Sequence, residues 1–239
     1  MVSLPPTAGY EPPDRDTHPD YVPALPAAAM QGVPRQEPGV RPARPVPYDL
    51  NAGADVSCST GTVRLRFVNA GRAAAVFQVR SGVGSDGPWT YTVGPGASLA
   101  DSWDPRSSGH DAYDLSVYGP NGFLRAYKGS LQPGNGAGAV ADLDVTSSYD
   151  CAGDSGITLA IRNRGAAAAK VRITDAYTTR VTVHVLRPGQ VFERHHALDR
   201  SHGWYDFSVE VEADASFRQQ LAGHVETGRD TFSDPALGA

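Results

Sequence analysis

The chain has 239 residues, 40% of them hydrophobic, and a formal net charge of −5. This length allows one or two domains with real cores, and the small negative charge argues against a strongly basic nucleic-acid-binding protein. No run approaches 18 apolar residues, so no transmembrane helix is expected. At the start of the chain, residues 1–6 lack a basic stretch followed by an apolar one, so no signal peptide is predicted.

Proline dominates the first part of the chain, because twelve of the 19 prolines lie before Asp49. Proline fixes φ and removes a hydrogen-bond donor, so such a stretch cannot form the interior of a helix or sheet. Residues 1–44 are therefore predicted to be an extended, partly polyproline linker. Tyr10, Tyr21, Leu25 and Met30 could pin it to a folded surface, so a free linker and a strap docked on its own chain or a neighbour both stay open.

The rest of the chain contains an internal repeat. Asn69-x-Gly71 matches Asn163-x-Gly165, and in the same alignment Cys58 falls on Cys151, Pro95-Gly96 on Pro188-Gly189, and YDLSV at 113–117 on YDFSV at 205–209. The two copies span about 45–132 and 139–228, and a tail follows at 229–239. Ordered self-similarity of this length predicts two related modules in tandem.

Each copy carries the residue pattern of β-strands. Apolar and polar residues alternate in the segments VRLRF at 63–67, WTYTV at 89–93 and YDLSV at 113–117, which predicts strands with one buried face. Gly- and Pro-rich turns interrupt at short intervals. The expected fold class is all-β, with two tandem immunoglobulin-like β-sandwich modules after a proline-rich segment. Tyr113 and Tyr205 are candidates for the corner tyrosine of such sandwiches, whose hydroxyl bonds nearby backbone.

Several longer blocks resemble one protein family. They are PTAGY at 6–10, HPDYVP at 18–23, QEPG at 36–39, GPWTYTV at 87–93, YDLSVYGPNGF at 113–123 and GHVETG at 223–228. Together they resemble the linker and C-terminal domains of bacterial phosphocholine-specific phospholipase C, and the resemblance covers essentially the whole chain.

The resemblance implies a division of labour with another domain. In that family a phosphatase-type catalytic domain hydrolyses phosphatidylcholine or sphingomyelin to release phosphocholine, and it would precede Ser3. No position here matches its catalytic motifs, so no catalytic residue is carried over and the chain alone is expected not to be catalytic. The resemblance also implies a secreted, extracellular protein whose partner is that catalytic domain. In the family the catalytic domain is part of the same chain (in cis); here it could also be on a separate chain (in trans).

The polar residues give little support for chemistry in the chain itself. Histidines gather in the second copy, but His195 and His196 are adjacent and would point to opposite faces of a strand, so they cannot easily share a metal. Asp101, Asp104 and Asp111 cluster near Trp103 in a Gly- and Ser-rich stretch that a solvated loop explains. The sequence therefore predicts no metal site, no cofactor and no catalytic residue.

Cys58 and Cys151 occupy the same place in the two copies. They could form a disulfide if the modules packed around an axis that brings these positions together, and an exported protein would permit the bond. The alternative is a pair of small, half-buried thiols.

Aromatic residues are the best candidates for a binding role: Trp89, Tyr91, Trp103, Tyr118 and Trp204. Loop aromatics at the end of a sandwich could insert among lipid headgroups or surround a choline cation through cation–π attraction. The alternative is that these rings pack cores and seal the contact between modules.

Three functions are open on these observations. The first is a non-catalytic accessory region of a secreted phospholipase C, which presents substrate or membrane or stabilises the catalytic domain. It predicts a choline phospholipid surface as partner and no nucleic acid. The second is a free-standing carbohydrate or cell-surface binding module, and the third is a purely structural tail. The long family blocks favour the first.

Overall fold

The computed structural model describes residues 27, 39–84, 86–132, 141–151 and 155–237. Tyr10, Tyr21, Leu25 and Met30 lie outside these residues. The end of the predicted linker is described: β1 (Pro42–Ala43) pairs with β16 (Thr231–Phe232) near the C-terminus. This end of the strap is therefore docked on its own chain. None of the described helices is long and apolar enough to cross a membrane.

Residues 50–130 form seven strands. They are β2 (Leu50–Ser57), β3 (Thr62–Asn69), β4 (Ala75–Ser81), β5 (Trp89–Val93), β6 (Ala97–Trp103), β7 (Ala112–Tyr118) and β8 (Leu124–Ser130), with the 3₁₀ helix η2 (Pro105–Ser108) before β7. Burial alternates along β3 as the sequence predicts, with Val63, Leu65 and Phe67 fully buried and Arg64 and Arg66 exposed. Period-2 hydrophobicity therefore defines which face of each strand lies in the core.

Residues 143–224 form seven further strands in the same order. They are β9 (Leu143–Asp150), β10 (Gly156–Asn163), β11 (Ala169–Asp175), β12 (Arg180–Leu186), β13 (Val191–Ala197), β14 (Trp204–Val211) and β15 (Asp214–His224), with the 3₁₀ helix η3 (Asp199–Ser201) before β14. The predicted all-β sandwich class is confirmed. The boundaries predicted for the modules stay a prediction.

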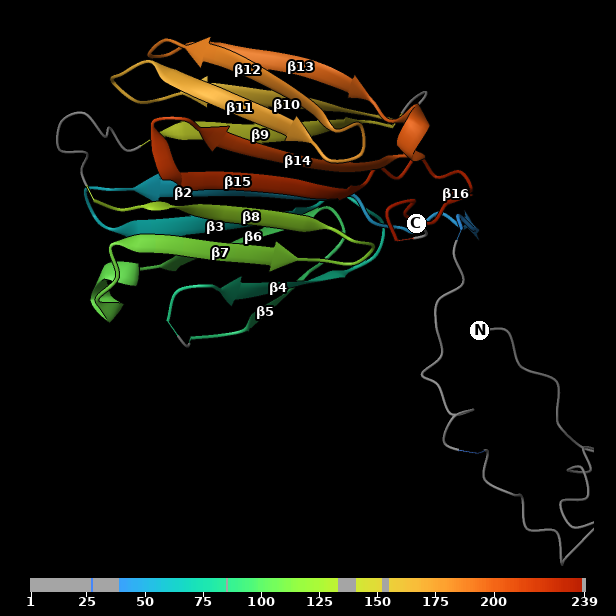
Figure 1. Cartoon of the computed structure of the whole chain (residues 1–239). Helices are drawn as coiled ribbons and strands as arrows, with labels where there is room; N and C mark the ends of the chain where they lie inside the picture. Colours follow the sequence, from blue (N-terminus) through green and yellow to red (C-terminus); the bar gives the residue numbers. More distant parts are fainter. Residues whose placement is uncertain (1–26, 28–38, 85, 133–140, 152–154, 238–239) are drawn as a thin grey trace, which may run out of the picture. The chain divides into compact units, whose positions relative to one another are not determined.

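The strands build two layers in each half (Figure 1). Three-stranded sheets β2-β3-β6 and β13-β10-β9 lie behind one eight-stranded sheet, whose order is β12-β11-β14-β15-β8-β7-β4-β5. Each half encloses its own core, one around Phe67 and Phe77 and the other around Leu159 and Phe207. The eight-stranded sheet runs through both halves, so the modules are joined by main-chain hydrogen bonds as well as by side chains.

The junction between the halves has an internal twofold relation. Tyr113 pairs with Gly129, and Tyr205 pairs with Gly223, so Gly129 and Gly223 are equivalent positions. Three residues before each lie Ala126 and Gln220, and these two pair with each other where β8 meets β15 antiparallel. Strands at corresponding places in the two halves therefore pair around a local twofold axis.

Arg125 is the most unusual residue at this junction, because its side chain is fully buried. It extends from β8 into the second half, where its guanidinium donates to the Tyr149 hydroxyl at 2.6 Å, the Tyr205 hydroxyl at 3.0 Å and the Ala222 carbonyl at 3.1 Å. The Phe123 ring lies 4.6 Å from the guanidinium carbon. Burial raises the pKa of the Tyr149 hydroxyl, so this partner is a neutral phenol. Among the described residues, no carboxylate forms an ion pair with Arg125.

The corner-tyrosine prediction is wrong for Tyr205. Among the described residues, its hydroxyl bonds the Arg125 side chain and the Tyr149 hydroxyl, at 3.0 Å each, and no nearby backbone group. The hydroxyl also lies against Gly223, where an added Cβ would approach it to 2.9 Å. This tyrosine therefore stabilises the contact between modules rather than a turn within one.

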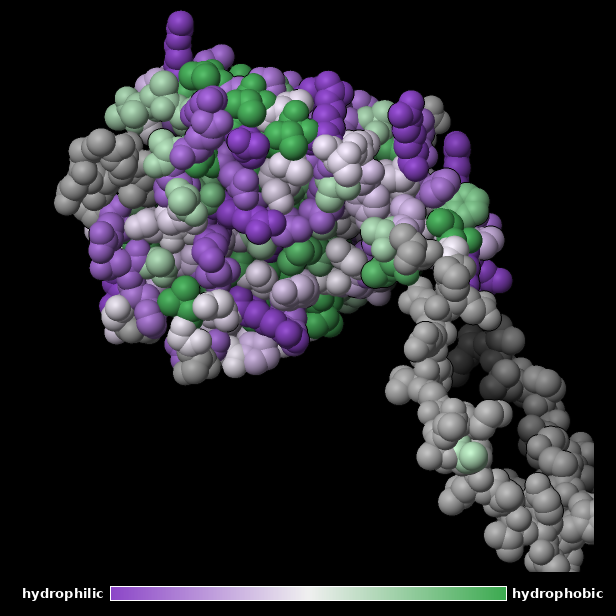
Figure 2. Space-filling model, in the orientation of Figure 1, coloured by the Kyte–Doolittle hydropathy of each residue, from purple (hydrophilic) through white to green (hydrophobic). Residues whose placement is uncertain are grey.

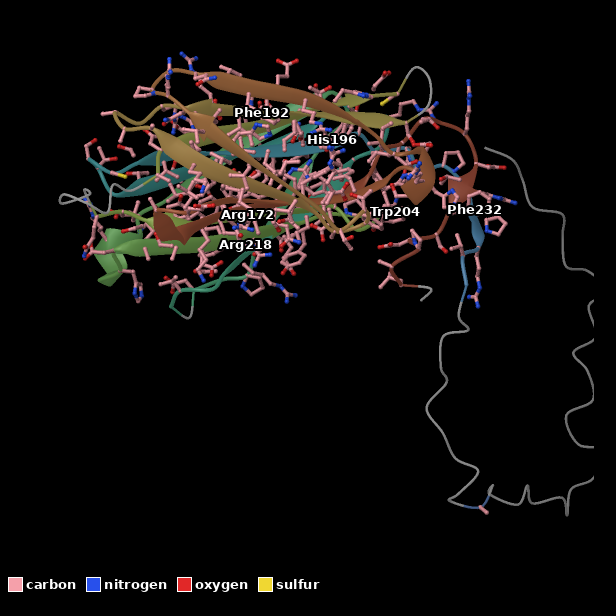
Figure 3. The ribbon with its side chains drawn as sticks, turned by 45° about the horizontal axis from the view of Figure 1, so that its top comes forward. Arg172, Phe192, His196, Trp204, Arg218 and Phe232 are labelled. Atoms are coloured by element: carbon pink, nitrogen blue, oxygen red, sulfur yellow. The ribbon has the colours of Figure 1, made fainter. Side chains whose placement is uncertain are left out.

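Two histidines of the second half are half-buried beside aromatic rings. The His196 ring lies 4.5 Å from that of Phe207, and the His184 ring 4.0 Å from that of Phe192. Figure 3 shows His196 and Phe192 in the body of the second half, away from Trp204 and Phe232 at its end. Burial, and then the charge of Arg194, lower the pKa of His196 from its ordinary value of 6.5.

We expect the chain to lose stability on acidification through His196. Since the folded state holds its pKa below 6.5, the unfolded chain binds this proton first, and the free energy of unfolding falls as the pH drops below about 6.5. Urea unfolding between pH 8 and pH 5 measures this slope. His196→Gln should flatten it, while His195→Gln, at the exposed neighbouring position, should change it much less, because burial and Arg194 outweigh His195 in lowering the His196 pKa. Equal slopes in native chain and His196→Gln would contradict the expectation.

Candidate functional site

One end of the first half contains a pocket of about 240 Å³. We call it the tryptophan pocket, because Trp89, at the start of β5, and Trp103, at the end of β6, both line it. The loop after β4, helix η2 and the start of β7 complete its wall; their lining residues include Asp86, Asp104, His110 and Asp114. The pocket therefore lies where strand ends and loops of both layers of the sandwich meet.

The two tryptophans form an edge-to-face pair. Their ring centroids are 5.5 Å apart and the ring planes meet at 71°. Behind them Tyr91 lies edge-on to Trp103 at 6.3 Å and stacks on the core residue Phe67 at 4.8 Å. Rings braced by a core in this way lose little freedom when a ligand binds.

Charge in the tryptophan pocket is mainly negative. Asp86, Asp104 and Asp114 line it, and no Lys or Arg is among its described lining residues. The Lys128 ammonium lies outside the lining, 3.3 Å from Asp114. Asp104 also caps η2, since its carboxylate accepts from the Ser107 amide at 3.1 Å. Aromatic faces combined with carboxylates suit an organic cation, which gains both cation–π and Coulomb attraction.

The structure brings together three of the five predicted binding residues. Trp89 and Trp103 line the pocket, and Tyr91 supports them while donating its hydroxyl to Asp101 at 2.6 Å. Burial, and then this hydrogen bond, raise the pKa of Tyr91. Tyr118 lies elsewhere, 43% exposed on the outer face of the eight-stranded sheet with Arg80 5.5 Å from its ring. Trp204 lies in the second half, where its indole N–H donates to the Phe232 carbonyl at 3.0 Å.

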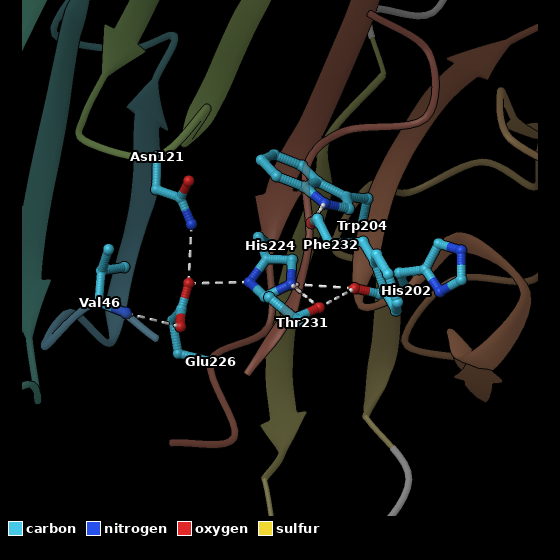
Figure 4. Close-up of polar contacts among 8 residues, drawn as sticks. All are labelled: Val46, Asn121, His202, Trp204, His224, Glu226, Thr231 and Phe232. Atoms are coloured by element: carbon cyan, nitrogen blue, oxygen red, sulfur yellow. Dashed lines mark hydrogen bonds and ion pairs between the residues drawn. The ribbon is translucent and has the colours of Figure 1, made fainter. Parts of the chain in front are cut away.

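A second polar cluster surrounds Glu226 and His224 (Figure 4). The Glu226 carboxylate accepts from the Asn121 side chain at 2.7 Å, from His224 Nδ1 at 2.8 Å and from the Val46 amide at 3.2 Å. Glu226, which follows the last strand of the second half, is thus bonded to the segment before β2 and to the turn between β7 and β8. The sequence alone does not reveal this cluster, because its members are far apart in the chain.

The His224 cluster does not have the chemistry of a catalytic triad. His224 Nε2 lies 3.0 Å from the His202 carbonyl and 3.3 Å from Thr231 Oγ1, and the Thr231 hydroxyl itself donates to that carbonyl at 2.9 Å. The Thr231 hydroxyl directs its proton at this carbonyl and not at Nε2, so it is not arranged to give that proton to His224. The cluster instead fixes the C-terminal segment against the sandwich.

Of the two alternatives for the cysteines, the structure has free thiols: Cys58 and Cys151 do not form a disulfide. β2 and β9 lie side by side and antiparallel. The Tyr149 hydroxyl, near the end of β9, bonds the Leu50 carbonyl at the start of β2. Arg164 bonds both Asp142, just before β9, and Asp55, near the end of β2. Cys58 comes just after the end of β2 and Cys151 just after the end of β9, so they lie at opposite ends of this antiparallel pair. Roughly 25 Å of strand separates them, whereas the Cα atoms of a disulfide lie within about 7 Å of each other. Burial raises the pKa of both thiols.

Comparison with known proteins gives consistent matches. The family model described as bacterial phospholipase C, C-terminal domain, matches residues 42–130 and 143–224. A non-hemolytic phospholipase C of Burkholderia pseudomallei (strain K96243) is 46% identical over 235 residues, covering 98% of this chain and 33% of that protein. In Pseudomonas aeruginosa, a non-hemolytic phospholipase C is 38% identical (88% of this chain, 30% of that protein) and a hemolytic one 35% identical (87% and 31%).

The chain spans about a third of the length of these curated relatives. The matched segments coincide with the two halves of the fold, from β1 to β8 and from β9 to β15. Because the family model matches well over half of the chain, the chain belongs to the bacterial phospholipase C, C-terminal domain family.

Proposed function

We propose that this chain is the non-catalytic accessory region of a secreted phospholipase C and that its tryptophan pocket binds the choline headgroup of phospholipids. The observation that carries the proposal is the pairing of Trp89 and Trp103 with three aspartates in one pocket. A trimethylammonium group is a cation that cannot donate an N–H hydrogen bond, so aromatic faces and nearby carboxylates are its natural partners. The phosphate and acyl chains would remain outside.

This role fits the rest of the molecule. Phosphatidylcholine and sphingomyelin share the phosphocholine headgroup, so one pocket would serve both lipids. The net charge of −5 gives little attraction to anionic membranes, whereas headgroup binding acts on zwitterionic ones. The catalytic domain would come from the part of the enzyme that this chain does not span, and the site of action would be outside the cell.

Choline binding by the purified chain tests the proposal. Isothermal titration with choline and phosphocholine should give a single site, and ethanolamine, which lacks the methyl groups, should bind more weakly. Trp103→Ala should weaken binding by about tenfold or more, since a desolvated cation–π contact contributes about 2 kcal/mol. Trp204→Ala is the matched control, because Trp204 lies outside the pocket, and it should bind choline like the native chain.

Vesicle sedimentation extends the test to lipid. Phosphatidylcholine and sphingomyelin vesicles should bring down the native chain, and phosphatidylglycerol vesicles should not. Loss of vesicle binding in Trp89→Ala and Trp103→Ala would support the pocket as the contact. Absence of binding to choline and to all vesicles would leave a structural role, and binding to glycans instead would favour a carbohydrate module.

A further inference from the structure

Strand β12 is an outer strand of the eight-stranded sheet. It pairs with β11 without a register shift from Asp175–Arg180 to Ala169–Leu186, and in the described part of the chain no strand pairs with its other side. β12 contains no proline, glycine or lysine, which are residues that commonly protect exposed edges from pairing. It is therefore a regular edge with free backbone donors and acceptors.

The outer face of β12 carries a row of exposed valines. Val181, Val183 and Val185 are 48%, 42% and 60% exposed. Figure 2 shows hydrophobic side chains gathered over this end of the sheet. The strand at the opposite edge, β5, presents threonines at its exposed positions, Thr90 and Thr92. The apolar row is thus particular to β12.

The inner face of β12 holds an independent signal. His184 packs against Phe192, and its Nε2 atom is buried with no hydrogen-bond partner among the described residues. Thr182, two residues earlier on the same face, carries a hydroxyl. A buried ring nitrogen without a hydrogen-bond partner costs free energy. An assembly that brings a hydroxyl to His184 Nε2 would remove that cost.

We propose that β12 pairs with β12 of a second copy of this chain, antiparallel and with the twofold axis at Val183. In this register Val181 lies opposite Val185 of the second copy, and the valines form one continuous row of cross-strand pairs. Thr182 lies opposite His184 of the second copy, so its hydroxyl can bond the unpartnered Nε2. A second copy therefore gives the valines on the outer face apolar neighbours and gives His184 on the inner face a hydrogen-bond partner.

Charge and symmetry agree with this occupant. The run from Val181 to Val185 contains no Lys, Arg, Asp or Glu, so no like charges meet at the axis. Arg180 lies opposite Leu186 of the second copy. The contact is isologous, as in most homodimers, and it repeats the way β8 and β15 already join the two halves of one chain. The dimer would continue the same sheet across both copies.

Sedimentation velocity of the full chain over a range of concentrations tests the proposal. The native chain should sediment at twice its mass of 25.2 kDa, and Val183→Lys, which places two ammonium groups at the axis, should sediment as a monomer. Val76→Lys is the matched control, because Val76 is 49% exposed on β4 inside the same sheet, and it should stay dimeric. A native chain that is monomeric at every soluble concentration, or a Val183→Lys dimer, would overturn the proposal.

Cysteine cross-linking tests the register and does not depend on the folding of Val183→Lys. In a chain carrying Cys58→Ser and Cys151→Ser, Val183→Cys should form an intermolecular disulfide on mild oxidation, since the two residues face each other at the axis. Val185→Cys should not, because it faces Val181 of the second copy. Cross-linking of Val185→Cys at an equal rate, or of neither variant, would refute this pairing.

Discussion

Replacing Arg125 with alanine should lower the free energy of unfolding by about 4 kcal/mol. The substitution leaves a cavity at the junction of the two halves and removes the donor that serves the hydroxyls of Tyr149 and Tyr205 and the carbonyls of Leu124 and Ala222. Arg125→Met should cost much less, because a buried charge carries a desolvation penalty that an apolar side chain of similar length avoids.

Urea unfolding of the two Arg125 variants decides between packing and charge. The Tyr149 and Tyr205 hydroxyls lie 3.0 Å apart, and the Tyr149 hydroxyl lies 2.8 Å from the Leu50 carbonyl, so these groups can bond without the arginine. Arg66→Ala, at an exposed position on β3, should change stability by no more than about 0.5 kcal/mol. If Arg125→Met were as unstable as Arg125→Ala, the guanidinium hydrogen bonds and not the filled volume would stabilise the junction.

Replacing Asn163 with alanine should destabilise the second half by about 3 kcal/mol. Asn163 is 1% exposed. Its side-chain amide donates to the carbonyls of Ala167 and Leu186 at 2.8 and 2.9 Å, and its carbonyl oxygen accepts from the Gly165 amide at 2.9 Å. Alanine would leave three backbone groups without these partners, and the bond to the Leu186 carbonyl is fully buried.

Asn69 provides the matched comparison in the first half. It donates to the carbonyls of Ala73 and Val93 at 2.8 and 3.0 Å and accepts from the Gly71 amide at 3.0 Å. Asn69→Ala should therefore cost about as much as Asn163→Ala, measured by urea unfolding, while Ser98→Ala at an exposed position should be close to neutral. A small effect in both asparagine variants would show that water replaces the lost bonds.

The elements of this protein could be predicted from its sequence because their causes are local. Alternation in segments such as VRLRF at 63–67 determines which side chains face the core, and the strand at 62–69 follows from it. The Asn-x-Gly pattern, repeated at 69–71 and 163–165, marks a turn whose asparagine bonds the chain on both sides. The long blocks of family sequence likewise led to the family that the comparisons show.

The site was only partly predictable, because spacing along the chain does not give position in space. Trp89 and Trp103 were identified as aromatic candidates, but their meeting with Asp86 and Asp114 depends on how the two layers of the sandwich close at one end. Tyr118 and Trp204 were candidates on the same grounds as the two tryptophans, but they lie outside the pocket.

The way the halves join was decided by the tertiary structure alone. Any exposed strand edge can accept another strand, so nothing local in β8 or β15 specifies their pairing. That pairing buries Arg125, which the sequence shows only as one of many arginines, and it sets β2 against β9 in opposite directions. A rotation about a twofold axis carries equivalent positions to opposite ends unless they lie near the axis, so Cys58 and Cys151, matched in sequence, are far apart in the fold.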